Sequence, residues 1–247
     1  MKRIVIVAML SILASALFCH RATNAWEFYQ LKGKVKSMTD LGVYEQTRYS
    51  FDKKGVLIGK EVGDLREETK KYRSEENYQK YEYEYSYNKA KALIGRKEMR
   101  GKEISCTETF EYDAQGVLTK SICIYPEAGY TYVTNYNANG QESSSSRSTE
   151  GYDGKEEIVY EYGDDPTQYK YSNYSDGLLM TVTVVTQDAD GLPLQFLVYD
   201  NDGVLLETTD IEYTKDAAGN GTTITYRTVR ENSEDSYTYE RSYEYYK

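Results

Sequence analysis

Histidine is almost missing from this chain. His20 is the only one among 247 residues, and it lies within a segment that is typical of an export signal. We therefore expect the mature protein to contain none. Without histidine, Ser-His-Asp triads, Cys-His pairs and histidine metal sites are all excluded. This shortage is the strongest functional restriction in the sequence, and it argues against an enzyme.

Long apolar runs are equally scarce, and the single one present marks an export signal. Lys2 and Arg3 precede an apolar stretch over 4–18, and Ala25 ends a small-residue cleavage site. The stretch is too short to favour a membrane span. We expect residues 1–25 to be a signal peptide and the mature chain to have no transmembrane span. The protein then resides in the periplasm or on the outer surface of a Gram-negative bacterium.

Cysteine is also rare, with three residues in the chain. A lipid anchor at Cys19 is the rival to plain cleavage, but the bulky Phe18 before it disfavours lipoprotein processing. Cys106 and Cys123 remain in the mature chain and are by default a candidate disulfide of an exported protein. The strand register derived below places them on opposite faces of a sheet. It therefore predicts that both thiols are free.

Basic residues are outnumbered by acidic ones. The formal net charge is −10, and loss of residues 1–25 removes three basic residues and no acidic one, leaving 27 basic and 40 acidic residues and a net charge of −13. Phosphate backbones repel such a chain, so we expect no nucleic-acid partner.

Tyrosine is the abundant aromatic residue, at 28 against five phenylalanines and one tryptophan, and the mean hydropathy is −0.73. A buried phenolic hydroxyl without a partner is costly, so tyrosine hydroxyls must reach water or an acceptor. This composition predicts a thin sheet with tyrosine rings lying on their neighbours and hydroxyls reaching its rim.

A short phrase recurs along the chain: an aromatic residue, Asp or Asn, two variable residues, Gly and often an aliphatic residue. Asp or Asn at the start of a type I turn accepts a backbone hydrogen bond, and Gly at the fourth position takes the left-handed conformation of a bulged turn. The predicted structural turn positions are Asp52, Gly55, Asp113, Gly116, Asn137, Gly140, Asp188, Gly191, Asp200 and Gly203.

The spacing of the phrase predicts one hairpin per copy. Asp113 and Asn137 are 24 residues apart, and Asn137 and Asp188 are 51 apart, about two periods. The predicted fold is all-β: a meander of antiparallel β-hairpins forming one long twisted or partly rolled sheet, with 26–247 as a single domain. The serine-rich stretch 141–149 is interpreted as a flexible connection through which the sheet continues.

The register can be predicted for the hairpin around Asp113. If Asp113 faces Val117 and this offset is kept, Cys106, Phe110, Ile122 and Ile124 share one face, whereas Cys123 lies on the other face among Thr and Ser residues. This arrangement separates apolar from polar residues, as a sheet with one buried face requires. It is the basis for predicting free cysteines.

The copies over 51–57, 112–118 and 199–205 resemble the YD repeats of RHS-type proteins, and the opening 31–37 resembles small exported proteins of Bacteroidetes-like bacteria. The resemblance covers most of 30–247 and implies an architecture. Large RHS proteins wind such repeats into a shell around a toxic domain, and this chain has no extra domain after its repeats. Neither toxin delivery nor any functional residue is carried over.

Two alternating tyrosine stretches are the candidate binding sites, for a glycan or a peptide. Their residues are Tyr81, Tyr83, Tyr85, Tyr87, Tyr237, Tyr239, Tyr243 and Tyr245. Cross-strand packing accounts for the same pattern and is favoured over binding. Carboxylates at Asp188, Asp190, Asp200 and Asp202 suggest calcium loops, but turn chemistry explains them better. We expect no metal, no cofactor and no catalytic residue.

The function that the sequence favours is an exported, non-enzymatic cell-envelope or surface protein that binds or scaffolds through a Tyr-rich sheet. Its partner would be an envelope protein, a glycan or a peptide. The alternative is a periplasmic lipid or lipoprotein acyl-chain carrier with a curved sheet, which needs an aliphatic lining that is sparse outside 178–185 and 192–206. A carbohydrate-active enzyme would need two convergent carboxylates, and no pair stands out.

Overall fold

The computed structural model describes residues 29–42, 45–64 and 78–247. The predicted signal peptide and Cys19 lie outside these residues. The described residues form sixteen strands. They are β1 Val35–Leu41, β2 Glu45–Phe51, β3 Leu57–Asp64, β4 Gln79–Tyr87, β5 Leu93–Arg100, β6 Glu103–Tyr112, β7 Leu118–Tyr125, β8 Tyr130–Tyr136, β9 Glu142–Thr149, β10 Tyr152–Tyr162, β11 Gln168–Ser175, β12 Leu178–Gln187, β13 Pro193–Asp200, β14 Leu205–Lys215, β15 Gly221–Arg230 and β16 Ser233–Tyr245. None of the described residues forms a helix long and apolar enough to cross a bilayer.

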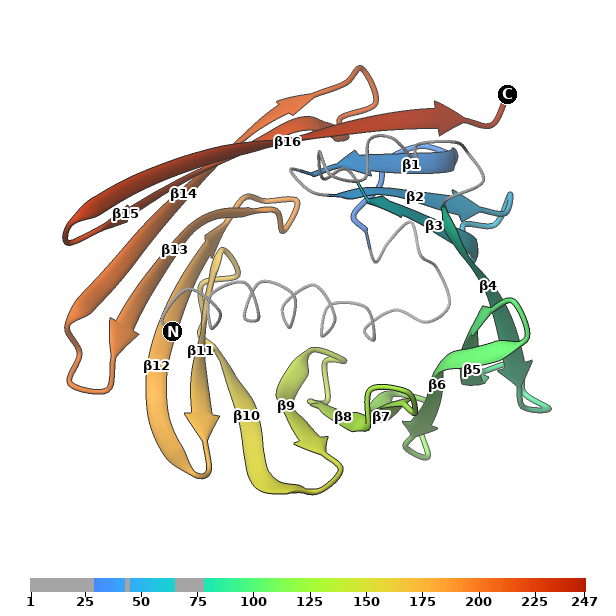
Figure 1. The fold of residues 1–247 in the computed structure, drawn as a ribbon, viewed down its shortest axis with the longest axis horizontal. Helices are drawn as coiled ribbons and strands as arrows, with labels where there is room; N and C mark the ends of the chain where they lie inside the picture. The colour runs from blue at the N-terminus through green and yellow to red at the C-terminus, as the bar shows by residue number, and fades with distance from the viewer. Residues whose placement is uncertain (1–28, 43–44, 65–77) are drawn as a thin grey trace.

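The sheet closes into a barrel (Figure 1). Each strand pairs antiparallel with the next along the chain, and β16 returns to pair with β1. The predicted meander of hairpins is confirmed, but the predicted open or partly rolled sheet is wrong. Strand twist accumulates over so many strands that the two end strands meet, and their pairing satisfies the edges that an open sheet would expose.

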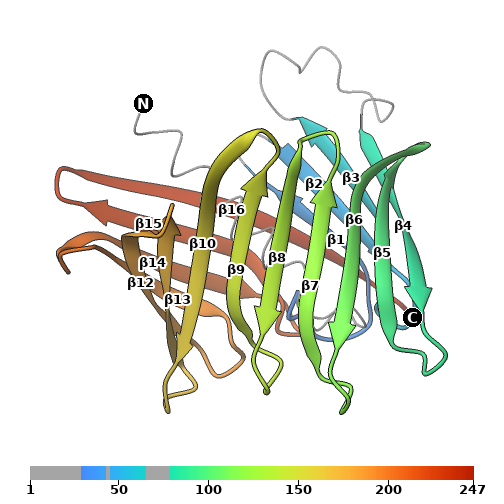
Figure 2. The same cartoon turned by 90° about the horizontal axis from the view of Figure 1, so that it is seen from below.

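Most repeat turns lie at one end of the barrel, which we call the repeat end (Figure 2). In the β6–β7 turn, Asp113 N donates to Val117 O at 2.9 Å, and Asp113 Oδ1 accepts from the backbone N–H of Gln115 and Val117. Gly116 has a φ of +83°. These bonds are those of the predicted bulged turn. The copy at Asp200 joins β13 to β14 and therefore lies at the opposite end.

The long gap between Asn137 and Asp188 contains one further hairpin, β10–β11, so the prediction of two periods is confirmed. The stretch 141–149 forms β9, which pairs with β8 and β10. Its interpretation as a flexible connection is wrong, although the sheet does continue through it. Ser145 is buried between Thr134 of β8 and Ile158 of β10, its partners in the two ladders.

The predicted register holds for one pair and then shifts. Tyr112 pairs with Leu118 as predicted, but Glu111 pairs with Lys120, because Thr119 is an extra, bulged residue. A one-residue shift exchanges the faces of a strand. Cys123 therefore shares the face of Cys106, and Ile124 is exposed on the other face.

The two faces of the sheet differ in character. The cross-strand pairs show which residues share a face. Every buried hydrophobic residue of the described chain lies on the same face, together with most tyrosines. We call this the inner face. Tyr29 identifies it as concave, because its ring contacts Tyr49 and Phe51 of β2 and it interacts electrostatically with Tyr83 of β4 and Arg96 of β5. One side chain can approach so many strands only from inside the barrel.

Candidate functional site

The predicted tyrosines all lie on the inner face. Their alternate positions on β4 and β16 place Tyr81, Tyr83, Tyr85 and Tyr87, and likewise Tyr237, Tyr239, Tyr243 and Tyr245, on the same side of the sheet. Strands β1, β2 and β3 lie between β4 and β16, so the two sets belong to one wall of the barrel. The rings also pack on each other, as in the pair Tyr226–Tyr237, whose centroids are 4.9 Å apart.

A recurring hydrogen bond explains much of the tyrosine content at the repeat end. In four hairpins, the strand that follows the turn begins two residues before its pairing with the next strand begins. The backbone carbonyl of its first residue therefore has no partner in that pairing. A tyrosine hydroxyl from the next strand donates a hydrogen bond to this carbonyl, at 2.5–2.8 Å. The pairs are Tyr85 to Leu57, Tyr112 to Leu93, Tyr213 to Pro193 and Tyr243 to Gly221. These tyrosines have a structural role.

Charged groups also lie on the inner face. Glu98 of β5 accepts hydrogen bonds from Lys60 Nζ at 2.9 Å and from the Tyr83 hydroxyl at 2.8 Å. Burial alone would raise the pKa of Glu98, but the Lys60 ammonium group and these hydrogen bonds outweigh it and hold the pKa below its usual value. Burial and the Glu98 charge raise the pKa of Tyr83. Glu98 is therefore ionised and Tyr83 neutral at physiological pH.

Two further ion pairs lie on this face. Arg96 of β5 and Glu108 of β6 approach to 2.8 Å, with the Glu108 side chain fully buried. Asp40 of β1 and Arg241 of β16 form a two-point pair at 2.5 and 3.2 Å. The second pair bridges the strands that close the barrel. The wall from β16 to β6 thus combines aromatic rings with compensated charges.

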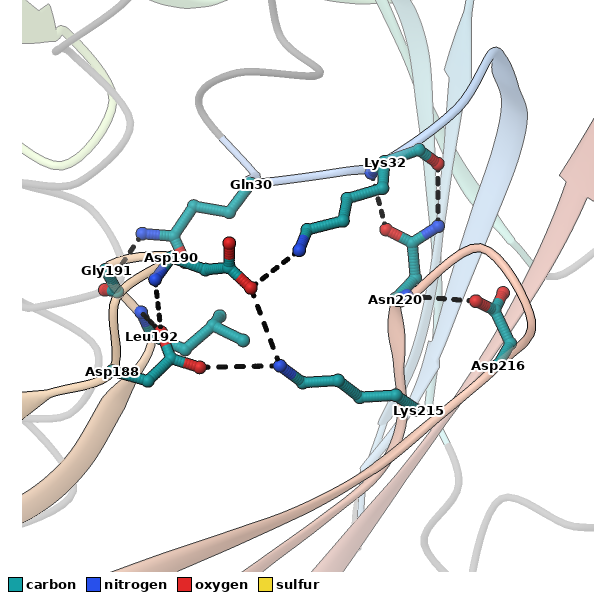
Figure 3. A network of polar contacts seen from close by, with 9 residues as sticks. All are labelled: Gln30, Lys32, Asp188, Asp190, Gly191, Leu192, Lys215, Asp216 and Asn220. Carbon is teal, nitrogen blue, oxygen red and sulfur yellow. Dashed lines mark hydrogen bonds and ion pairs between the residues drawn. The ribbon is translucent and has the colours of Figure 1, made fainter.

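Residues 29–34 form a strap across the repeat end (Figure 3). Gln30 Nε2 donates to Gly191 O in the β12–β13 turn at 3.0 Å. The backbone N–H and C=O of Lys32 bond the side chain of Asn220, beside the β14–β15 turn, at 2.6 and 2.8 Å. Lys32 Nζ reaches Asp190 at 2.6 Å. The strap therefore ties the chain before β1 to two repeat turns.

Three of the four carboxylates suggested for calcium, those of Asp188, Asp190 and Asp200, bond groups within the protein. Asp188 Oδ1 accepts from the backbone N–H of Asp190 and Leu192, and its Oδ2 lies 3.4 Å from Lys215 Nζ. Asp200 Oδ1 accepts turn N–H groups in the same way. No group of three or more metal-ligating side chains occurs among the residues that the structure describes. Turn chemistry accounts for Asp188 and Asp200, and Asp190 forms ion pairs with Lys32 and Lys215.

Cys106 and Cys123 are both free and buried, and they lie in one cluster with Tyr125 and Tyr132. The prediction that they occupy opposite faces is wrong, because the Thr119 bulge was missed. They are diagonal neighbours, since Cys123 faces Glu108. The two thiols lie close enough to share a hydrogen bond, so the register gives no reason against a disulfide. The absence of a disulfide stays a prediction.

Glu142 is an acidic residue on the inner face that sequence reasoning did not single out. It is 6% exposed, and it begins β9 opposite Tyr136. Burial raises the pKa of Glu142 to about 7, although a hydrogen bond with Tyr160 opposes the rise. The signal was available: the same position in the other copies holds an uncharged residue, which is leucine at Leu57 and Leu93 but Pro193 and Gly221 elsewhere.

The other residues missed were the partners of the inner-face ion pairs. Lys60, Glu98, Arg96 and Glu108 come from four different strands. In the sequence, each of these residues is a charged residue at a position of an alternating strand that points inward. Recognising it as inward requires the correct strand register.

The fold resembles that of a porin-like protein from Bacteroides uniformis. The two chains share 12% identity at a TM-score of 0.55, and the match covers 86% of this chain and 98% of the other. The similarity to a Bacteroides protein is thus a similarity of fold. A chain of the structure titled TcdB2-TccC3-Cdc42 matches 80% of this chain at 15% identity and a TM-score of 0.27, and the match covers 14% of that chain. Comparisons with protein-family models and with curated protein sequences found no match.

Proposed function

We propose that the mature protein is a non-enzymatic binding protein of the Gram-negative cell envelope, and that its ligand contacts the inner face of the barrel. The observation that carries the proposal is the composition of that face. Tyrosine rings and paired charges line the wall from β16 to β6. Rings that stack and charges that hydrogen-bond suit a polar ligand with apolar faces, such as a glycan or a peptide.

The acyl-chain carrier is less well supported, because ionised groups such as Glu98 and Arg241 would have to lie against the hydrocarbon. A glycosidase is disfavoured for a related reason. Glu98 is paired with Lys60, which helps to hold its pKa below the usual value, and a carboxylate with a lowered pKa is a poor general acid. Glu108 is paired with Arg96.

The outer face supports a barrel surrounded by water. Arg48, Glu61 and Lys80 form an exposed ion-pair row across β2, β3 and β4, and Glu161 pairs with Lys170 across β10 and β11. Charged side chains on a lipid-facing barrel surface cost about 2–4 kcal/mol each at the bilayer midplane. We therefore propose that the chain acts at or beside a membrane without spanning it.

Native mass spectrometry of the protein exported from a Gram-negative host tests the proposal. The expected result is a bare mature mass plus a retained mass that dissociates on activation. Tyr239→Ser, on the inner face of β16, should reduce retention. Tyr199→Ser, on the outer face of β13, is the matched control and should not. Retention lost in the Tyr199 variant alone, or no ligand retained by the wild type, would contradict the proposal.

A further inference from the structure

Glu142 occupies a repeat position that holds a buried leucine in two other copies, at Leu57 and Leu93. The further copies have uncharged residues there that are not fully buried: Leu118, Pro193, Leu205 and Gly221. Leu57, Leu93 and Glu142 each follow the Asp or Asn of their turn by five residues, and each pairs with the residue before that Asp or Asn. They are 3%, 0% and 6% exposed. Burying a carboxyl where the fold accepts leucine lowers stability. The repeat itself thus indicates that this carboxyl has a role other than folding.

Glu142 also differs from the other buried acids of the inner face. Glu98 and Glu108 are each paired with a cation, Lys60 and Arg96. Glu142 forms no ion pair with any described residue, and its Oε1 has no hydrogen-bond partner among them. Among the residues that the structure describes, its carboxyl shares a hydrogen bond with Tyr160. Oε1 is therefore a buried acceptor without a partner among the described residues.

The surroundings of Glu142 are aromatic. Its charge raises the pKa of Tyr160, Tyr162 and Tyr169, in each case after burial, so all three lie close to it. The rings of Tyr162 and Tyr169 are 5.7 Å apart and tilted by 31°. Tyr160 packs on Tyr171 at 5.8 Å. Three rings on β10 and β11 thus lie near one carboxyl, and Tyr171 packs behind one of them.

A second departure from the repeat occurs at Tyr162. The pairing of β10 with β9 ends at Val159, and Tyr162 lies three residues further along β10. Tyr85, Tyr112, Tyr213 and Tyr243 occupy this position in other hairpins and donate to the first carbonyl of the preceding strand. Within the described part of the chain, Tyr162 makes no such bond to Glu142, and it is 38% exposed.

We propose that Glu142 and the tyrosines of β10 and β11 bind an organic ammonium group. A carboxylate attracts the cation, and desolvated aromatic faces add cation–π energy. The net charge of the chain, −10, also favours cations over anions. Tyr162 marks the exposed side from which the group enters. This inference rests on the proposed function, because it names the chemical class of a ligand for the same inner face.

Calorimetric titration with choline and with 3,3-dimethylbutan-1-ol, its uncharged isostere, tests the inference. Choline should bind the mature wild type about tenfold more tightly than the alcohol. Glu142→Gln, which keeps the shape and a hydrogen bond to Tyr160, should abolish that preference. Glu142→Leu restores the repeat residue, and should also abolish the preference while the protein remains folded. Glu161→Gln, an exposed acid of the same strand, is the control and should keep the preference.

Equal binding of choline and the alcohol by the wild type would overturn the inference, as would an undiminished preference in Glu142→Gln. Retention of a native ligand measured by mass spectrometry is independent of this titration. If the exported protein carries a ligand but shows no choline preference, the ammonium site is wrong and the inner-face function stands. If it carries none and shows no preference, both fail.

Discussion

At the scale of single residues, the tyrosine hydroxyl distinguishes structural from binding tyrosines. The Tyr112 hydroxyl donates to Leu93 O at 2.7 Å, whereas Tyr87 is 51% exposed and its hydroxyl makes no hydrogen bond to the described residues. Tyr112→Phe should lower the free energy of unfolding by about 1–2 kcal/mol, because a partly buried carbonyl loses its donor. Tyr87→Phe should change it by less than about 0.5 kcal/mol. Urea denaturation of both variants measures the difference, and equal effects would contradict the structural role.

The Glu142 carboxyl should make stability depend on pH. Its folded pKa is about 7 and its ordinary value is 4.5. Between these values the folded state keeps a proton that the unfolded state loses, so stability falls as pH rises through this window and levels off above it. The slope is at most about 1.4 kcal/mol per pH unit. Tyr160, Tyr162 and Tyr169 do not titrate there, because their pKa values are raised from 10.

Unfolding midpoints measured between pH 5 and pH 8 check this expectation. Glu142→Gln should remove the contribution of this group, and the difference between variant and wild type should grow with pH. Glu161→Gln, at an exposed position, should follow the wild type. A difference that shrinks with rising pH would mean that the Glu142 carboxylate is stabilised in the fold.

At the scale of elements, the turn is the unit that the sequence specifies best. Gly116 adopts a φ of +83°, and Lys91 takes a φ of +64° at the same turn position. A Cβ added at Gly116 meets nothing within 4 Å, so backbone strain alone decides the effect of a substitution there. Gly116→Lys should therefore destabilise the protein by about 1–2 kcal/mol, and Lys91→Gly should stabilise it by up to about 1 kcal/mol. Thermal unfolding of the two variants and of the double exchange tests both signs.

The strap is an element whose attachment depends on one amide. Asn220 bonds both backbone groups of Lys32 and the Tyr245 hydroxyl. Asn220→Ala should cost about 2–3 kcal/mol and speed amide exchange over residues 29–34, because buried backbone groups lose their partner. Gln30→Ala removes one exposed hydrogen bond and should leave exchange at Lys32 nearly unchanged. Unchanged exchange in Asn220→Ala would mean that the other contacts of the strap, such as the ion pair to Asp190 and the Gln30 hydrogen bond, are enough to hold it.

The part of the fold that could be predicted was local. The Asp113 turn needs four residues and an Asp side chain, so its bonds and the hairpin period follow from the sequence. The register did not, because the Thr119 bulge is set by the pairing of whole strands. The alternation of the inner-face tyrosines was visible in the sequence. That their side chains point into the barrel follows only from the closure of the sheet. Glu142 is the exception: aligning the repeat copies would have exposed it without a structure.

At the scale of the whole molecule, closure turns a row of hairpins into an enclosed surface. In an open meander the tyrosine face would be accessible along its length, whereas in the barrel it lies inside. Closure depends on the pairing of β1 with β16, the two strands most distant in sequence. The strap strengthens the same region, since Tyr246 N also donates to Lys34 O at 2.8 Å. We call the β1–β16 pairing the seam. Its stability therefore controls whether an inner-face ligand is retained.

Two ion pairs across the seam allow that statement to be tested. Arg241–Asp40 lies on the inner face with side chains 28% and 25% exposed, and Lys36–Glu244 lies outside with side chains 56% and 69% exposed. Arg241→Met should cost about 3 kcal/mol, because the largely buried Asp40 carboxylate loses its cation. Lys36→Met should cost less than about 1 kcal/mol. Urea denaturation gives both values, and amide exchange should accelerate in β1 and β16 of the Arg241 variant before the rest of the barrel. Uniform acceleration in all strands would instead mean that the barrel opens as one cooperative unit, with no weaker seam.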